Sequence, residues 1–280
     1  MSDKILITGA KGQLGTELAK LLPKAVLTDV ADLDITDLTA VQCFVRKNNI
    51  GTIINCAAYT AVDKAEDNIE LASKINIVGP ENLAKTGCRV IHVSTDYVFD
   101  GLGHKPYTPT DKTNPISVYG KTKRIGEMAV LENAETSVVI RTAWLYSAYG
   151  KNFVKTMQRL GSEKESLNVV ADQVGTPTYA ADLAKAIADI LPQMKDGQKG
   201  IYHFTNEGVC SWYDFARKIM ELSELKCQVN PIPSSAYPTK ATRPFYSVLS
   251  KETIKNDFGI KIAHWEDGLK RCLKEMEKCK

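Results

Sequence analysis

The sequence lacks a long apolar stretch, an excess of one charge and any low-complexity tract. No apolar run approaches the roughly 20 residues that a membrane-spanning helix requires, so no membrane partner is expected. The 36 basic and 33 acidic residues leave a net charge of only +3, which gives no dense field for nucleic acid. The segment MSDKILITG enters a predicted strand at once, so no signal peptide is expected there.

The sequence also lacks the cysteine and histidine patterns of disulfide frameworks and metal sites. The four histidines lie far apart and are not at ligand spacing from a cysteine or carboxylate, so no metal is predicted. The seven cysteines form no CxxC pair and are odd in number, which favours reduced thiols and a cytoplasmic location. They are Cys43, Cys56, Cys88, Cys210, Cys227, Cys272 and Cys279.

Short β-branched runs alternate with helical patterns through the first half of the chain. Strands are predicted at Lys4–Thr8, Ala25–Thr28, Thr52–Asn55, Arg89–Ser94 and Ser137–Arg141. Helices are predicted at Leu14–Leu22, Thr36–Asn48, Asn68–Lys85 and Ile116–Glu132, the last beginning near Pro115. This order predicts an α/β fold with a Rossmann-type doubly wound parallel sheet.

The rhythm changes after Arg141, and 280 residues approach the upper limit of a single core. We therefore expect a Rossmann domain at 1–147 and 179–207, and a smaller α/β domain at 148–178 and 208–280. The later elements expected are helices at Phe153–Leu160, Thr178–Leu191 and from about Trp265, and strands at Leu167–Val170 and Gly200–Phe204, the last returning to the main sheet.

A glycine-rich loop joins the first predicted strand to the first predicted helix. In ILITGAKGQLGTEL the spacing is G-x-x-G-x-x-G. Glycine allows a tight turn and close approach to a pyrophosphate, and the helix start offers unpaired N–H groups. The triplet alone is a weak signal, but its place between strand and helix predicts dinucleotide binding. The expected contacts are Gly9, Lys11, Gly12, Gln13, Leu14 and Gly15.

Asp29 ends the second strand, twenty residues after Gly9. An acid at this position accepts hydrogen bonds from the adenosine ribose, which favours NADH. Lys11 lies inside the loop, and its ammonium group would offset the charge of a 2′-phosphate, so NADPH also stays open. The alternative for Asp29 is a turn carboxylate without a ligand.

Tyr119 and Lys123 lie four residues apart in VYGKTK, which puts both on one face of the predicted helix. Alone, the pair would more simply be part of a solvated helix face. The strand before this helix, however, runs into Ser94 and Thr95 at the carboxyl edge of the sheet, where ligands of open α/β sheets bind. These side chains are therefore expected to meet in one cleft.

With these residues the chain resembles the extended short-chain dehydrogenase/reductase superfamily. The resemblance implies that Tyr119 protonates a carbonyl oxygen, that Thr95 holds this oxygen, and that Lys123 binds the nicotinamide ribose of NADPH or NADH. Lowering a tyrosine pKa by about three units toward neutrality needs about 4 kcal/mol. A lysine about 4 Å away, at an effective dielectric constant near 20, would supply that much.

Longer motifs resemble the dTDP-4-dehydrorhamnose reductase family from the glycine loop almost to the carboxyl terminus. They are NCAAYTAVDKAE (55–66), STDYVFDG (94–101), RTAWLY (141–146) and SAYPTKATRP (235–244). The resemblance implies reduction of the 4-keto group of a small dTDP-sugar during synthesis of dTDP-L-rhamnose, a precursor of cell-surface polysaccharide. It also implies that the smaller domain binds the substrate.

The same resemblance assigns further contacts. Thr95, Asp96 and Trp144 would face the sugar, and Arg243 would bind the substrate diphosphate. The alternatives are that Trp144 is a core aromatic residue and that Arg243 forms a surface ion pair. The implied cofactor contacts, besides the glycine loop and the Tyr119 and Lys123 pair, are Asp34, Ile35, Ala57, Ala58, Tyr59, Thr60 and Val93.

Two rival functions share this fold. Nucleotide-sugar 4,6-dehydratases usually carry Thr-Asp-Glu at the strand end, but Tyr97 takes the third position here, so the acid for dehydration is missing. A regulatory subunit that binds NADP(H) without turnover would resemble the same family, as the methionine adenosyltransferase beta subunit does. The presence of Thr95, Tyr119 and Lys123 together argues against it.

Some family members are metal-linked dimers that use a glutamate early in the first helix and acids from the second domain. Glu17 matches the first position, but Ala181 and Asp182 stand where a pair of acids would be wanted. We therefore expect no required metal, and either a monomer or a homodimer.

Overall fold

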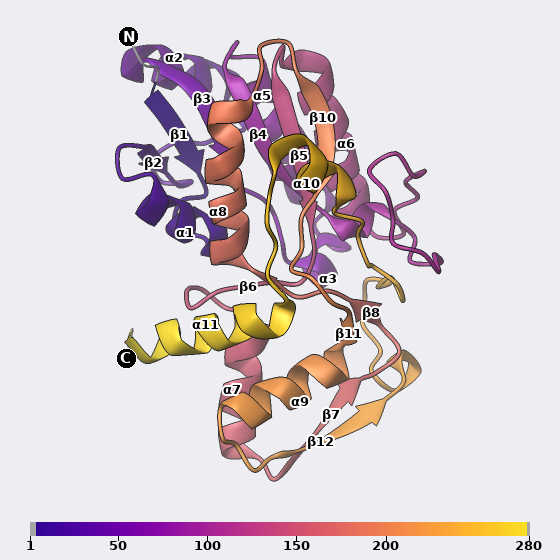
Figure 1. The fold of residues 1–280 in the computed structure, drawn as a ribbon. Coiled ribbons are helices and arrows are strands. Elements are labelled where there is room, and N and C mark those ends of the chain that lie inside the picture. The colour runs from indigo at the N-terminus through magenta and orange to yellow at the C-terminus, as the bar shows by residue number, and fades with distance from the viewer. Residues whose placement is uncertain (1–3, 279–280) are drawn as a thin grey trace.

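The computed structural model describes residues 4–278. A six-stranded parallel sheet with the order β10-β5-β4-β3-β1-β2 forms its centre (Figure 1). The predicted doubly wound sheet is confirmed, and the late strand does return to its edge. The strands are β1 (Lys4–Thr8), β2 (Val26–Thr28), β3 (Ile50–Asn55), β4 (Arg89–Thr95), β5 (Ser137–Thr142) and β10 (Lys199–His203).

Helices cover both faces of the sheet because its strands alternate their apolar side chains between two cores. On β1, Ile7 packs in one core and Leu6 in the other. The first core includes α1 (Gln13–Leu21), α8 (Ala180–Ile190) and α10 (Glu252–Phe258). The opposite face is covered by α2 (Leu38–Asn48), α5 (Gly79–Ala84) and α6 (Val118–Asn133).

Several helix boundaries differ from the prediction, two of them as follows. The stretch expected as one helix at Asn68–Lys85 contains α4 (Ile69–Ser73), a π-helical segment (Lys74–Val78) and α5, and a short α3 (Val62–Ala65) precedes it. Helix α6 begins at Val118 rather than near Pro115, because the Ser117 hydroxyl accepts a hydrogen bond from the Gly120 N–H and caps the helix there.

The second unit has its own core, built around α9 (Trp212–Leu222). Its other main elements are α7 (Phe153–Glu163), the parallel pair β7 (Ser166–Val170) and β12 (Gln228–Ile232), and α11 (Trp265–Lys278). The sequence predicted α7, β7 and α11 but missed α9, β12 and α10. Two-residue strands connect the units: β6 (Leu145–Tyr146), β8 (Val174–Gly175), β9 (Thr178–Tyr179) and β11 (Cys210–Ser211).

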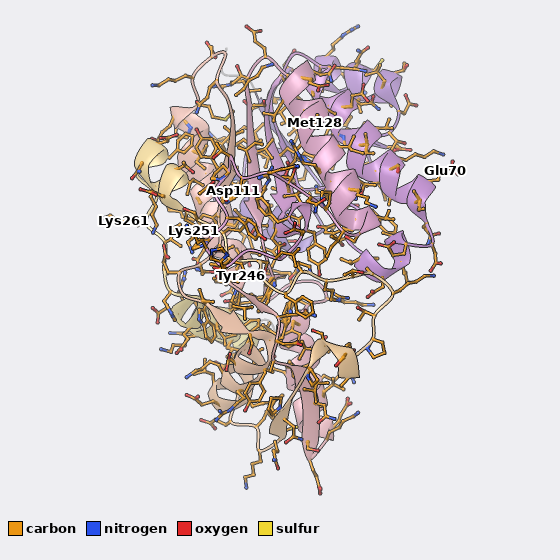
Figure 2. The ribbon with its side chains drawn as sticks, turned by 90° about the vertical axis from the view of Figure 1, so that its right-hand side faces the viewer. Glu70, Asp111, Met128, Tyr246, Lys251 and Lys261 are labelled. Carbon is orange, nitrogen blue, oxygen red and sulfur yellow. The ribbon has the colours of Figure 1, made fainter. Side chains whose placement is uncertain are left out.

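Helix α10 bears on the proposed domain division, which placed 208–280 in the smaller domain. Ile254 and Phe258 of α10 pack in the core of the main sheet. The segment before α10 runs between the units, and Figure 2 shows Tyr246 and Lys251 at that level. Within this segment, the Tyr246 N–H donates to the Gly101 carbonyl. The division remains a proposal, and the packing of α10 favours moving it to the Rossmann domain.

Within residues 4–278, no disulfide joins any pair of cysteines, and Cys279 lies outside the described residues. No helix in this range is long and apolar enough to cross a membrane.

Candidate active site

A cavity of about 790 Å³ follows the carboxyl ends of the central strands. It lies where the chain order of the sheet reverses between β1 and β3, the usual ligand position in such sheets. Its volume is within the range of small-molecule sites. Of the expected site residues, it is lined by Gly9, Gly12, Gln13, Leu14, Gly15, Asp29, Asp34, Ile35, Ala57, Ala58, Thr60, Val93, Thr95, Asp96, Tyr119, Lys123 and Trp144.

The glycine loop is folded too tightly for side chains. Gly9 has φ +64°, and a Cβ there would lie 2.7 Å from the Ala57 nitrogen. A Cβ on Gly15 would lie 2.4 Å from the Gly9 oxygen. Helix α1 starts at Gln13 with no side-chain cap, and its first turn lines the cavity. These N–H donors and the close backbone fit the pyrophosphate of a dinucleotide.

Asp29 holds its carboxylate at the end of β2 through two backbone bonds. Oδ2 accepts from the Lys11 N–H at 3.1 Å, and Oδ1 accepts from the Val30 N–H at 2.8 Å. The residue is thus a turn carboxylate, and it also lines the cavity. Because each carboxylate oxygen can accept a second bond, Asp29 keeps capacity for ribose hydroxyls. Lys11 is exposed outside the cavity wall.

Tyr119 projects from the first turn of α6 into the cavity wall, with its ring edge-on to Tyr97 at 5.4 Å. Burial raises the pKa of Tyr119 above its usual value, although a hydrogen bond to Thr95 opposes the shift. The charge of Asp96 raises it further. The expected lowering of the Tyr119 pKa is therefore wrong for this structure, because loss of water around the phenol outweighs the stabilisation of its anion.

Lys123 lies one turn further along α6 and is 1% exposed. Its Nζ donates to the Val93 carbonyl on β4 at 2.7 Å. Burial lowers the pKa of Lys123 to about 8, although the charge of Glu127 opposes the shift. The ammonium group is therefore held at the cavity wall by the strand and sits close to the balance between its charged and neutral forms.

Ser94, Thr95 and Asp96 bring three polar side chains to the end of β4, each at least nine-tenths buried. The Thr95 hydroxyl donates to Asp96 Oδ1 at 3.0 Å. Among the described residues, Ser94 Oγ and Asp96 Oδ2 have no hydrogen-bond partner. Burial raises the pKa of Asp96 to about 6. Because unpartnered buried polar atoms are costly, these groups fit a polar ligand.

Trp144 lines the cavity on an unusual backbone. Its φ is +47°, a left-handed conformation that is strained for a bulky side chain. The indole stacks on Trp212, with ring centroids 3.7 Å apart and an interplanar angle of 12°. Trp212 comes from α9, so the second unit supports this part of the wall. Strain of this kind clusters at functional sites, which favours a ligand role over a core role for Trp144.

Arg243 lies outside the cavity wall. One guanidinium nitrogen donates to Asp63 at 2.7 Å, and another donates to the Tyr97 hydroxyl at 3.1 Å. Arg243 therefore forms the ion pair that was the alternative to a ligand contact, although its other partner, Tyr97, lines the cavity. A contact between Arg243 and a substrate diphosphate remains a proposal.

The sequence prediction missed Asn76, which fixes the segment around Tyr59. Asn76 is fully buried in the π-helical segment. Its Oδ1 accepts from the Tyr59 N–H at 2.8 Å, and its Nδ2 donates to the Tyr59 carbonyl at 3.2 Å and to Thr122 Oγ1 at 3.1 Å. Tyr59 itself is outside the cavity wall. The sequence signal that could have identified Asn76 is its amide on the apolar face of the helix predicted at Asn68–Lys85.

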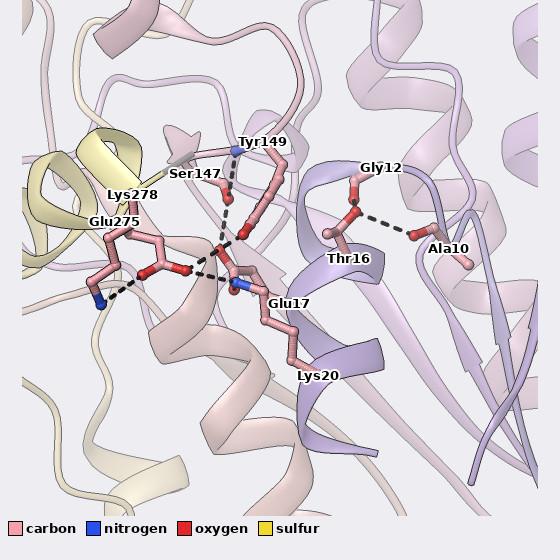
Figure 3. A network of polar contacts seen from close by, with 9 residues as sticks. All are labelled: Ala10, Gly12, Thr16, Glu17, Lys20, Ser147, Tyr149, Glu275 and Lys278. Atoms are coloured by element: carbon pink, nitrogen blue, oxygen red, sulfur yellow. Dashed lines mark hydrogen bonds and ion pairs between the residues drawn. The ribbon is translucent and has the colours of Figure 1, made fainter. Parts of the chain in front are cut away.

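The glutamate considered for a metal site faces protein groups (Figure 3). Glu17 accepts from the Ser147 hydroxyl at 2.8 Å and pairs with Lys20 at 3.0 Å. Lys20 also pairs with Glu275 of α11 at 3.3 Å. Asp182 receives two hydrogen bonds from Arg271. Within residues 4–278, no cluster of three or more His, Cys, Asp or Glu residues is arranged to hold a metal.

Comparisons with known proteins show the family to which the chain belongs. A family model described as RmlD substrate binding domain matches residues 3–278. The dTDP-4-dehydrorhamnose reductase of Aggregatibacter actinomycetemcomitans is 42% identical, over 95% of this chain and 97% of that protein.

Solved structures of similar proteins give the same result. A dTDP-4-dehydrorhamnose reductase from Clostridium acetobutylicum is 44% identical with a TM-score of 0.94, covering 98% of this chain and 99% of that one. The Bacillus anthracis enzyme in complex with NADP is 39% identical with a TM-score of 0.93, covering 98% of this chain and 100% of that one. The chain belongs to the dTDP-4-dehydrorhamnose reductase family.

Proposed function

We propose that this protein reduces the 4-keto group of dTDP-4-dehydro-β-L-rhamnose to dTDP-L-rhamnose, a precursor of cell-surface polysaccharide, with NADPH or NADH. The observation that carries the proposal is the convergence of Thr95, Tyr119 and Lys123 on the same cavity as the glycine loop. A bound reduced nicotinamide would supply the hydride to the substrate carbon. The glycine loop, Asp29 and the Ala57–Thr60 segment would hold the dinucleotide.

In this proposal the chain's own residues handle the proton and the substrate. Because burial keeps Tyr119 in its protonated form at neutral pH, its hydroxyl is ready to donate to a carbonyl oxygen. The Thr95 hydroxyl would exchange its bond to Asp96 Oδ1 for one to the same oxygen and hold it in place. Asp96 Oδ2 would accept from a sugar hydroxyl, and Trp144 would pack against the sugar face. Lys123 would bind the nicotinamide ribose.

The Tyr119→Phe variant tests this assignment. We expect a loss of roughly 10²–10⁴-fold in kcat with dTDP-4-dehydro-rhamnose and NADPH, because the phenyl ring cannot donate a proton. Oxidation of the cofactor is followed by absorbance. The matched control is Tyr202→Phe, whose hydroxyl donates to Asp257 on α10 outside the cavity wall, and which should keep wild-type kcat. An undiminished rate for Tyr119→Phe would refute the proposal, and no turnover by the unmutated protein would favour a regulatory subunit.

A further inference from the structure

Two buried polar side chains, His92 and Asn55, lie behind Lys123, on the side away from the cavity. His92, in the middle of β4, is fully buried, and its Nε2 is 3.4 Å from Lys123 Nζ. Its other ring nitrogen, Nδ1, is 3.0 Å from Asn55 Nδ2 at the end of β3. Neither His92 nor Asn55 lines the cavity. His92 therefore contacts Lys123, and neither His92 nor Asn55 is placed to contact a ligand in the cavity.

A backbone hydrogen bond fixes which atoms donate and which accept between Asn55, His92 and Lys123. The Ala57 N–H lies 3.1 Å from Asn55 Oδ1, and a backbone N–H can only donate, so this amide atom is the oxygen. The Thr8 hydroxyl donates to the same oxygen at 2.7 Å. The Asn55 NH₂ group therefore faces His92, and Nδ1 must accept with its lone pair. A neutral imidazole has one N–H, which is consequently on Nε2 and points at Lys123.

The orientation of His92 decides which form of Lys123 is favoured. An ammonium group has three donors and no acceptor, so it cannot hydrogen-bond to an N–H. A neutral amine accepts the Nε2–H with its lone pair and still donates to the Val93 carbonyl. The ring itself stays neutral, because burial and the nearby Lys123 charge keep the pKa of His92 well below its usual value.

Few other charges act on Lys123. Glu127, on the same helix, is bonded to Arg141 of β5 and to Arg124, which offset its charge. Burial raises the pKa of the Cys56 thiol to about 12, so this group is neutral. Burial likewise keeps Tyr119 protonated. Around α6, Glu66 accepts from the Val118 N–H, and Glu70 pairs with Lys74. His92 is therefore the contact best placed to adjust the proton on Lys123.

We propose that Asn55 and His92 form a tautomer lock that favours the neutral amine of Lys123 and so sets the pH at which Lys123 gives up its proton. The inference rests on the proposed function. When the Lys123 ammonium gives up its proton, the new amine accepts the His92 Nε2–H and keeps its bond to the Val93 carbonyl. His92 and Asn55 are positioning residues, since they act through Lys123.

The first test reads the tautomer directly in the unmutated protein without turnover. Nitrogen-15 labelling of the four histidines, with the His92 signal assigned by its loss in His92→Gln, reports which ring nitrogen carries the proton. We expect a protonated Nε2 and an unprotonated Nδ1 throughout pH 6 to 9. A proton on Nδ1, or on both nitrogens, would overturn the proposal whether or not the protein is a reductase.

The second test compares two amide variants by the pH at which reductive kcat/KM falls. His92→Gln keeps an N–H donor facing Lys123, whereas His92→Asn is too short and leaves room for a water that can accept from the ammonium. In the wild type the rate should fall above pH 8, close to the pKa of Lys123. The kcat/KM of His92→Gln should fall at the same pH as that of the wild type. The kcat/KM of His92→Asn should fall at a pH about one unit higher, which corresponds to the free energy of one hydrogen bond.

Equal profiles for His92→Asn and the wild type, or equal shifts in both variants, would overturn the proposal. If His92→Asn does not fold, the tautomer measurement alone decides, because it needs no substitution in the protein being measured. Failure of the proposed function would appear separately, as no turnover by the unmutated protein.

Discussion

Asn76 should stabilise the fold and the cofactor loop together, and Asn76→Ala tests this. The amide makes three hydrogen bonds, two with the Tyr59 backbone and one with Thr122 on α6. At about 1 kcal/mol each, their loss should lower the free energy of unfolding by about 3 kcal/mol. The loss should be fully felt, because the side chain is 0% exposed and water cannot replace it.

The same substitution should weaken NADPH binding by about tenfold, equivalent to about 1.4 kcal/mol. Ala58 and Thr60 line the cavity on either side of Tyr59, so releasing Tyr59 lets the segment leave its binding conformation. Chemical denaturation gives the stability, and fluorescence titration with NADPH gives the affinity.

The matched control is Thr122→Val. It removes the Asn76–Thr122 bond and the bond from Thr122 Oγ1 to the Tyr119 carbonyl, but it keeps both bonds to Tyr59. We expect a stability loss of about 1–2 kcal/mol and little change in NADPH affinity. A loss below about 1 kcal/mol for Asn76→Ala, or equal affinity losses in both variants, would show that Asn76 does not hold the loop.

Two further predictions concern buried charges. Glu127→Gln should lower the free energy of unfolding by about 3–5 kcal/mol in chemical denaturation, because Glu127 and Arg141 are both at most 1% exposed and share two 2.8 Å bonds. As a control, replacing the half-exposed Glu163 in Glu163→Gln should lower the free energy of unfolding by less than about 1 kcal/mol. Equal losses of stability in the two variants would contradict the reasoning. For Asp96, burial raises the carboxyl pKa from 3.8 to about 6, so the folded state binds more protons between these values. Its stabilising contribution is full below about pH 4 and lost as pH rises through about 6, and Asp96→Asn should remove up to ~3 kcal/mol of this pH dependence. An unchanged pH dependence of stability would show that the Asp96 carboxyl has the same pKa in the folded and unfolded states.

Local sequence patterns were sufficient to predict the elements whose structure depends mainly on their own residues. The β-branched runs predicted all six strands of the main sheet, and β1 was predicted with its observed bounds. Some missed elements lie where tertiary contacts override local signals. Pro231 lies within β12, and its missing N–H is tolerated there because β12 and β7 form a two-stranded sheet in which each strand has a free edge.

Helix α9 had a readable start that the prediction did not use. The Ser211 hydroxyl accepts from the Asp214 N–H, and the Asp214 carboxylate accepts from the Ser211 N–H, which is a capping box. The split of the predicted Asn68–Lys85 helix was not readable in this way. The π-helical segment there turns Asn76 toward Tyr59, a contact between residues 17 positions apart in sequence.

The sequence by itself determined the sheet, the glycine loop and the chemical groups available for a reaction, because these depend on periodicity, on steric limits of glycine and on residue type. Only the tertiary structure decided the protonation of those groups. Burial, which depends on every packed element, raises the pKa of Tyr119 and lowers that of Lys123. The tautomer of His92 likewise follows from a bond to Asn55, 37 residues away, which no local pattern specifies.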